Sequence, residues 1–149
     1  MVIDVPYVSL KHTLLCLKMQ VRDSMPYVEE YLPYNIDSPA ELFRFLKPQL
    51  TYKNDPSGVE WIRTLQTLLE NGGQGDCDCF TVAALASLIW LGFDRVYVAI
   101  VGNTRQGPTH IYAEVYDPTK GKITAMDFTN PVYNMQRNYK YKQRLRFQL

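Results

Sequence analysis

The sequence Gly75-Asp76-Cys77-Asp78-Cys79-Phe80-Thr81 decides the fold, because it joins a glycine-rich break to an apolar segment. The break before it is Asn71-Gly72-Gly73-Gln74, and glycine accepts the positive φ angles at which a helix or strand ends. The apolar segment after it, Val82 to Leu91, is rich in alanine, which predicts a buried helix. Asp76 is a favourable N-cap for that helix, because its carboxylate can accept from the free amides of the first turn.

Cys77 is thereby predicted at the first helical position. Backbone amides and the helix dipole favour a thiolate there over a thiol, and the thiolate is the nucleophilic form. The neighbours Asp76 and Asp78 oppose this effect, since like charges raise the pKa of a thiol. The helix terminus and a nearby imidazolium must outweigh the two carboxylates if Cys77 is to react.

Two predicted strands carry residue types that could assist a reactive cysteine. One runs from Thr109 to Val115 with His110 near its start, and the other runs from Ile123 to Thr129 with Asp127 near its end. The sequence Asp117-Pro118-Thr119-Lys120-Gly121 between them is typical of a turn. The two strands are therefore predicted to form an antiparallel hairpin.

A hairpin loop from Pro118 to Gly121 determines the register of these strands. Tyr112 then lies opposite Asp127, and His110 and Asp127 become diagonal neighbours on one face. A slip of one residue would put His110 and Asp127 on opposite faces. The other face is apolar and is predicted to pack on the helix; it carries Ile111, Ala113, Val115, Met126 and Phe128.

Cys77, His110 and Asp127 together have the residue types of a triad for acyl transfer. The thiolate attacks an amide carbonyl, the imidazole moves the proton, and the carboxylate orients the imidazole. The backbone amide of Cys77 is expected in the oxyanion hole, with the Gln74 side chain as a candidate second donor.

The motifs around these residues resemble the transglutaminase-like superfamily of cysteine peptidases. They are Gly-Asp-Cys-Asp before an apolar helix, Thr-His-x-Tyr-x-Glu-Val, and an Asp-x-Thr strand end. The sequence from Leu50 to Gly75 is similar to small members encoded by phages and prophages. The resemblance covers residues 38 to 130. It implies a Cys77-His110-Asp127 triad acting on a peptide or isopeptide amide, with a virion or cell-wall partner as one possibility.

The elements and the resemblance predict an α+β fold with a papain-like or transglutaminase-like core, in which N-terminal helices pack on an antiparallel β-sheet. The length of 149 residues fits one domain. We expect a helical extension over residues 1–37, the motif-bearing core over 38–130, and a C-terminal strand within 131–149.

Composition restricts the function classes. The formal net charge of +1 gives no overall electrostatic bias, so nucleic acid is not expected as a partner. No apolar run reaches the ~20 residues of a membrane helix, and the start Met-Val-Ile-Asp-Val-Pro lacks the pattern of a signal peptide. Cytoplasmic synthesis is therefore expected, with virion association as an option. Three cysteines do not make a disulfide framework, and no cofactor or metal is expected.

The first half of the chain predicts helices. Leu10 to Arg22 is a helix candidate, and Ser38-Pro39-Ala40-Glu41 is a capping box that starts another, which ends before Pro48. Thr51 to Gly58 is predicted as a polar loop. The apolar residues from Val59 to Leu69 have helical spacing.

The second half predicts strands around a loop. Arg95 to Gly102 is a buried central strand, and Asn103 to Pro108 is a polar loop that could rim the site. Tyr139 to Leu149 alternates basic and apolar residues, which predicts a half-exposed strand. Its basic face could contact nucleic acid, anionic cell-wall polymers or an acidic partner; a solvated face of an edge strand is the simpler interpretation.

Other interpretations of the cysteines stay open. Cys79 faces away from Cys77 on a helix, so it is expected as a small core residue rather than the nucleophile. A zinc site of Cys77, Cys79, His110 and Asp127 has suitable ligand types but lacks the usual two-residue cysteine spacer. The alternative function is a non-catalytic structural or interaction module that kept the fold.

Overall fold

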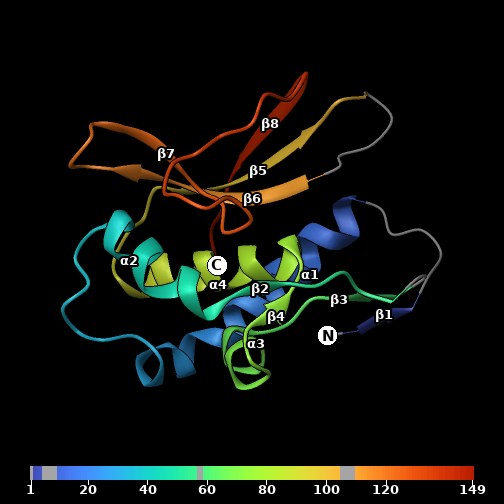
Figure 1. Cartoon of the computed structure of the whole chain (residues 1–149), viewed down its shortest axis with the longest axis horizontal. Helices are drawn as coiled ribbons and strands as arrows, with labels where there is room; N and C mark the ends of the chain where they lie inside the picture. The colour runs from blue at the N-terminus through green and yellow to red at the C-terminus, as the bar shows by residue number, and fades with distance from the viewer. Residues whose placement is uncertain (1, 5–9, 57–58, 105–109) are drawn as a thin grey trace.

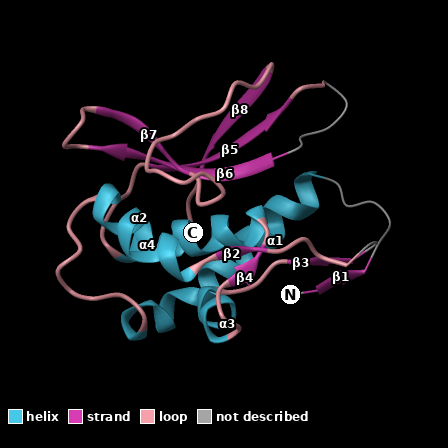
Figure 2. Cartoon of the chain, in the orientation of Figure 1, coloured by secondary structure: helices cyan, strands magenta, loops and turns pink. Residues whose placement is uncertain are grey.

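The structure is a computed structural model, and it describes residues 2–4, 10–56, 59–104 and 110–149. A layer of helices lies against one side of an antiparallel β-sheet (Figures 1 and 2). The helices are α1 (Leu10–Ser24), α2 (Pro39–Leu46), α3 (Leu65–Glu70) and α4 (Cys77–Trp90), with 3-10 turns η1 (Met25–Glu30) and η2 (Lys47–Gln49). The strands are β1 (Val2–Asp4), β2 (Thr51–Tyr52), β3 (Val59–Trp61), β4 (Gln74–Gly75), β5 (Val96–Gly102), β6 (His110–Asp117), β7 (Lys122–Met126) and β8 (Tyr141–Arg146). The predicted α+β class is confirmed.

The main sheet has the strand order β7-β6-β5-β8, with every neighbouring pair antiparallel. The β6–β7 hairpin has the predicted loop, since β6 ends at Asp117 and β7 begins at Lys122. Its ladder runs from Asp117↔Lys122 to Ala113↔Met126, which is the predicted register. Alternate residues of each strand therefore face α4 or face away from it; we call these the inner and outer faces of the sheet.

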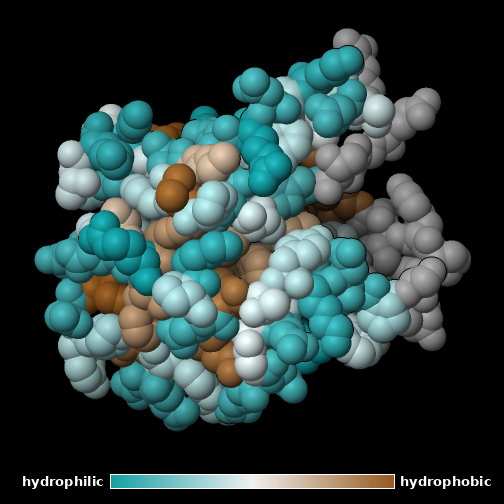
Figure 3. All heavy atoms as spheres, in the orientation of Figure 1, coloured by the Kyte–Doolittle hydropathy of each residue, from teal (hydrophilic) through white to brown (hydrophobic). Residues whose placement is uncertain are grey.

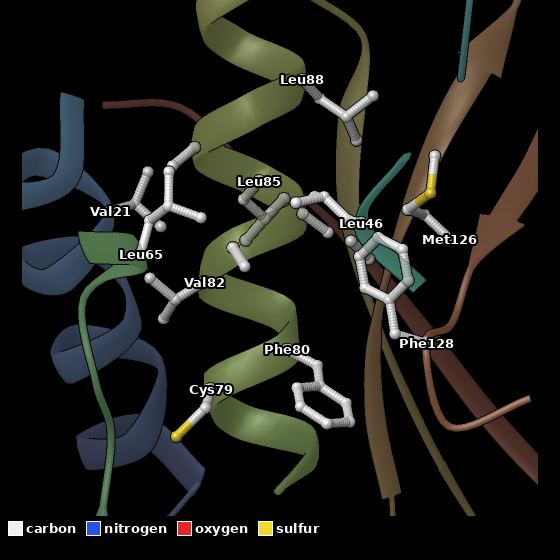
Figure 4. Packing of buried hydrophobic residues seen from close by; sticks show 14 of the residues in the cluster. Val21, Leu46, Leu65, Cys79, Phe80, Val82, Leu85, Leu88, Met126 and Phe128 are labelled. Atoms are coloured by element: carbon white, nitrogen blue, oxygen red, sulfur yellow. The ribbon is translucent and has the colours of Figure 1, made fainter. Parts of the chain in front are cut away.

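Helix α4 is the centre of the hydrophobic core. Ten of its apolar and small residues are almost fully buried, as the alanine-rich sequence predicts for a helix with neighbours on several sides. Val21 of α1 and Leu65 of α3 pack on one side of it, and Met126 and Phe128 of the sheet half on the other (Figure 4). The Phe128 ring also stacks on Phe43 of α2 at 5.1 Å. The start of α4 is thus held between the helical layer and the sheet.

The capping box before α2 is confirmed. The Ser38 hydroxyl accepts from the Glu41 amide at 3.2 Å, and Pro39 is the first helical residue. The Glu41 carboxylate accepts from the amide of Asp37 at 3.3 Å. The helix ends at Leu46, as predicted.

The predicted helix from Val59 to Leu69 is wrong in its first half. Val59–Trp61 is strand β3, paired antiparallel with β1, and only Leu65–Glu70 is helical. Thr64 is the reason, because its extended backbone and its side chain, which accepts from the Thr67 amide, start the helix there. The polar loop predicted from Thr51 likewise begins with strand β2, which pairs in parallel with β4.

Strand β8 lies at the edge of the sheet, as predicted, but its basic face is not simply solvated. Lys142 and Arg144 both bond Glu114 of β6, and Arg146 donates to the backbone carbonyl of Asp94 at 3.1 Å. Of the predicted loop from Asn103 to Pro108, residues 105–108 lie outside the described residues, so its position at the site is not tested.

Hydrophilic residues cover much of the face in Figure 3, and hydrophobic residues show between them in small patches, several of which lie over the helical layer. In the part of the chain that the structure describes, no helix has the length and apolar character needed to cross a membrane.

Candidate functional site

The turn before Cys77 requires its glycines. Gly73 has a φ of +73°, and a Cβ added to it would lie 1.7 Å from the carbonyl oxygen of Gln49. A Cβ on Gly75 would lie 2.8 Å from the Cβ of Cys79. The backbone of the turn is fixed by amides of β2 and the residue after it, since Thr51 donates to Gly73 and Lys53 donates to Gly75, each at 2.9 Å. The chain therefore enters α4 along a fixed path.

Asp76 caps α4, as the sequence predicts. Its backbone is extended, and its Oδ1 accepts from the amides of Asp78 at 3.2 Å and Cys79 at 3.5 Å. Cys77 is the first residue of the helix. Its own backbone amide is therefore among the N-terminal amides of α4 that have no intrahelical acceptor.

The contact between His110 and Asp127 is also confirmed. His110 Nε2 lies 2.7 Å from Asp127 Oδ2, and the two side chains are 13% and 5% exposed. The other oxygen, Oδ1, accepts from the amide of Thr129 at 3.1 Å and from its hydroxyl at 2.7 Å. Asn130 Nδ2 donates to Oδ2 at 3.2 Å. These donors hold the carboxylate in one orientation toward the imidazole.

The sulfur of Cys77 lies at the start of β6. The sulfur is close enough to the backbone amide of Ile111, the residue that follows His110, for that amide to lower the pKa of the thiol. The side chain is partly buried, whereas Cys16 and Cys79 are almost fully buried. The fold thus brings the N-terminus of α4 to the strand end that carries the His110–Asp127 pair.

The expected thiolate character of Cys77 is not supported by its surroundings. Burial raises the pKa of the Cys77 thiol most, and the charges of Asp78 and Asp76 raise it further. The Ile111 amide lowers this pKa, and Asp127 raises it again. Burial and the two flanking carboxylates therefore favour the protonated thiol over the thiolate.

Asp76 has a second carboxyl group beside it. The Asp55 side chain favours the protonated form of Asp76, both as a hydrogen-bond partner and through its charge. Burial, this hydrogen bond and the charge of Asp55 raise the pKa of Asp76 from 3.8 to about 7, against the lowering effect of the Cys79 and Asp78 amides. Asp55 Oδ2 also accepts from the Trp61 amide at 2.7 Å. The acid pair therefore joins the β2–β3 connection to the cap of α4.

Cys79 is a structural residue. Its side chain points to the α1 side of α4, away from Phe80 and the sheet (Figure 4). The sulfur donates to the carbonyl of Trp61 at 3.0 Å and accepts from the amide of Arg63 at 3.5 Å. Burial raises the pKa of its thiol to about 12. The expectation of a core residue is confirmed, with the addition that the sulfur bonds the backbone between β3 and α3.

The donors for an oxyanion remain a prediction. Gln74 lies in the two-residue strand β4, with an exposed side chain. Cys77 offers its helix-start amide, as described above. The zinc site that the sequence left open finds no support, because the described residues contain no group of three or more His, Cys, Asp and Glu side chains placed to hold a metal.

Several residues of the site were missed from the sequence. Thr129 and Asn130 hold Asp127, and Arg137 Nε donates to Asn130 Oδ1 at 2.9 Å. The available signal was the spacing of a threonine two residues and an asparagine three residues after Asp127, since both side chains can bond back to a preceding carboxylate. Arg137, by contrast, carries no local pattern that points to the site.

Comparison with known proteins shows the fold. No protein-family model and no curated protein matches the chain at the level of sequence. LapG from Legionella pneumophila matches in structure with 15% identity and a TM-score of 0.51, over 87% of this chain and 77% of LapG. Its calcium-bound form matches with 14% identity and a TM-score of 0.51, over 80% of this chain and 75% of LapG. A candidate protease from Parabacteroides distasonis matches with 14% identity and a TM-score of 0.53, over 80% of this chain but only 26% of that protease. The chain thus shares the fold of LapG.

Proposed function

We propose that this protein is a cysteine peptidase or amidase in which Cys77 is the nucleophile, His110 the general base and Asp127 the residue that orients the base. The substrate is a peptide or isopeptide amide. The observation that carries the proposal is the 2.7 Å contact between His110 Nε2 and Asp127, at the strand start whose Ile111 amide acts on the Cys77 thiol at the first residue of α4.

This geometry assigns the two nitrogens of His110. Nε2 faces Asp127, so the N–H at this nitrogen donates a hydrogen bond to the carboxylate, and the ring is held in one tautomer. Nδ1 is the nitrogen left to receive the proton of Cys77. Because the thiol pKa is raised, the proton moves to Nδ1 as the sulfur attacks, rather than before substrate binds.

The reaction then follows the chemistry of a triad. The sulfur forms a bond to the amide carbon, and the carbonyl oxygen takes the negative charge toward the Cys77 amide, with Gln74 proposed as a second donor. The imidazolium returns its proton to the leaving amine, which gives a thioester. Water activated by His110 hydrolyses the thioester, or a second amine captures it, so that hydrolysis and acyl transfer share these residues.

Finer parts of the resemblance stay predictions. None of the comparisons points to a phage protein, a virion or a cell-wall partner, and the cytoplasmic location expected from the sequence is equally untested. The alternative of a non-catalytic module that kept the fold is decided by the experiment below.

Calcium is bound in one LapG structure. The acid residue before Cys77 does not fit such an ion as it is arranged, because the Asp76 Oδ1 is occupied by two amides. The described residues also offer no group of three ligands. No step of the proposed mechanism involves a metal.

The test uses a peptidyl nitrile, which a catalytic thiol converts to a thioimidate. Wild-type protein should form a covalent adduct on Cys77, detected by intact and peptide mass spectrometry. Cys77→Ala should form none, and His110→Ala and Asp127→Asn should react at least about a hundredfold more slowly. Cys16→Ala is the matched control, since it removes a buried thiol of α1 and should react like wild type.

Thermal melting accompanies each variant. Cys77→Ala should melt within a few degrees of wild type, because a partly buried residue at a helix start leaves a small cavity and alanine is a good helix former. A folded wild-type protein that is inert toward peptide, isopeptide and cell-wall nitriles would contradict the proposal and favour the interaction module.

A further inference from the structure

The imidazole of His110 is held by more than its bond to Asp127. A single hydrogen bond at Nε2 fixes one atom of the ring but leaves its tilt free. Two tyrosine rings lie nearly parallel to it: Tyr112 at 5.5 Å between centroids and 30° between planes, and Tyr139 at 6.2 Å and 28°. Contacts of this kind favour a defined relative orientation of the rings.

The two tyrosines are positioned by different parts of the fold. Tyr112 belongs to β6 itself and is 4% exposed. Tyr139 lies outside any helix or strand, in the segment between β7 and β8. It packs against a small outer-face cluster formed by Ala99, Val101, Tyr112 and Ala125. Its position therefore depends on how that segment is anchored.

Topology takes this segment across the outer face. Strands β7 and β8 are at opposite edges of the sheet, and α4 occupies the inner face. The segment begins at the edge of β7, where the amide of Asn134 donates to the Ala125 carbonyl at 3.1 Å and the Ala125 amide donates to Asn134 Oδ1 at 2.9 Å. The bond from Arg137 to Asn130 at 2.9 Å ties its middle to a residue that holds Asp127.

The far end is anchored by Glu114, which is 1% exposed on the outer face. Its carboxylate accepts from Lys142 Nζ at 2.7 Å and from Arg144 Nε at 2.7 Å. Ala99 of β5 lies between Arg144 on one side and Tyr112 on the other. This small side chain leaves room for the long basic residues to reach across β5.

A buried ion pair is often no more stabilising than apolar residues of similar size, and in some proteins it serves instead to select one register. Glu114 bonds Lys142 and Arg144 of β8, and β8 starts two residues after Tyr139. The ion pairs on the outer face therefore set where the Tyr139 ring lies on His110.

We propose that Tyr139 is a positioning residue for His110: its ring, anchored by Asn130–Arg137 on one side and by Glu114 with Lys142 and Arg144 on the other, holds the imidazole in the tilt at which Nδ1 meets the Cys77 sulfur. The inference rests on the proposed function. The ring face also attracts the imidazolium that forms when His110 takes the thiol proton. The sequence feature that looked like a solvated basic strand is thus part of the site.

The test measures alkylation of Cys77 by iodoacetamide from pH 5 to 9, with peptide mass spectrometry. The difference in alkylation rate between wild type and His110→Ala gives the part of the rate that depends on His110. Tyr139→Leu, which keeps bulk but removes the ring, should lower that part by roughly tenfold and shift the acid limb of the pH profile. Tyr139→Phe, which keeps the ring, should stay within about twofold of wild type. Tyr34→Leu is the matched control, because Tyr34 is 86% exposed.

The outcomes separate the two proposals. If His110→Ala and wild type react alike at every pH, the proposed function fails. If His110 accelerates the reaction but Tyr139→Leu matches Tyr139→Phe, only the positioning role of Tyr139 fails. Faster labelling of the buried Cys16 and Cys79 in Tyr139→Leu would show general loosening of the fold, and would also overturn the specific role.

Discussion

Glu114 on the outer face of the sheet and Asp76 at the start of α4 are both withdrawn from water, but their negative charges are treated in opposite ways. Glu114 receives two cations, Lys142 and Arg144, each with a bond of 2.7 Å. Asp76 is joined to Asp55, another acid, and receives only backbone amides in addition. One region is neutralised by opposite charge, whereas the other depends on a proton.

This difference distinguishes a region whose charges stabilise the fold from a region whose charges act on a residue proposed to react. The charges of the outer-face ion pairs neutralise one another. These pairs therefore affect the rest of the molecule mainly through the positions of the residues that they hold. At the start of α4 the acid charges act on the Cys77 thiol, whose pKa they raise. Acids without cations are costly at a buried site, and they control the protonation of the residue that is proposed to react.

The largest effect is expected when the cations are removed from Glu114. The double variant Lys142→Met/Arg144→Met leaves a carboxylate that is 1% exposed without a counter-ion, which should cost roughly 3–5 kcal/mol of unfolding free energy. Glu114→Gln should cost only about 1 kcal/mol, because the Lys142 and Arg144 side chains are 32% and 40% exposed and can be solvated.

Urea denaturation of the two variants measures this asymmetry. Lys140→Met is the control for loss of an exposed positive charge on the same segment. Equal destabilisation by Glu114→Gln and by the double variant would contradict the view that Glu114 is the buried member of the cluster.

The same contrast explains how much could be predicted from the sequence. The residues of the inner face could be predicted from the alternation of apolar residues along each strand. One hairpin loop then sets the register, and Ala113↔Met126 is paired as the turn sequence predicts. The capping box at Ser38 and the cap at Asp76 are local patterns and were equally predictable. Cys77, His110 and Asp127 could be proposed as a triad because each lies at the end of a predictable element.

The remaining features depend on partners distant in the sequence. Glu114 meets Lys142 and Arg144 across 28 and 30 residues. Asp55 meets Asp76 only because β2 and β4 pair in parallel. The helix predicted over Val59 to Leu69 failed for a similar reason, since strand β3 is made by pairing with β1. The predicted division at residues 37 and 130 stays a prediction.

A moderate effect is expected on the pH dependence of stability. The pKa of Asp76 is about 7 in the folded protein and about 3.8 in the unfolded chain, so the folded state binds more protons between these values. Stability from this group is present below pH 4 and is lost as pH rises through 7. Three pKa units correspond to at most about 4 kcal/mol, and relaxation of the loop will reduce this value.

Asp55→Asn tests that sign. The asparagine oxygen can keep the bond to the Trp61 amide, and its NH2 group can donate to an ionised Asp76. The variant should therefore be more stable than wild type by about 1–3 kcal/mol at pH 8, and the gain should shrink toward pH 5. Asp23→Asn, at an exposed position of α1, controls for net charge. A gain that is independent of pH would refute the raised pKa of Asp76.

The smallest effect concerns the thiol itself. Asp78 is 7% exposed, and after burial its charge is the largest cause of the raised pKa of Cys77. Asp78→Asn should lower that pKa, which increases the thiolate fraction at a given pH. Alkylation of Cys77 by iodoacetamide at pH 8 should then rise by about threefold to tenfold, since a tenfold change is one pKa unit.

Asp76→Asn separates the two acids. Asparagine still caps the helix, so α4 should remain folded. Because Asp76 is largely protonated below its pKa of about 7, its removal should accelerate alkylation of Cys77 at pH 8 but hardly at pH 6, whereas Asp78→Asn should act at both. Cys16 and Cys79, both buried, serve as internal references in the same digest. Equal acceleration by both variants at pH 6 would mean that Asp76 is charged there. Protonation of Asp76 would then not reduce the negative charge beside the thiol at pH 6, and the contrast between Asp76 and Glu114 would fail.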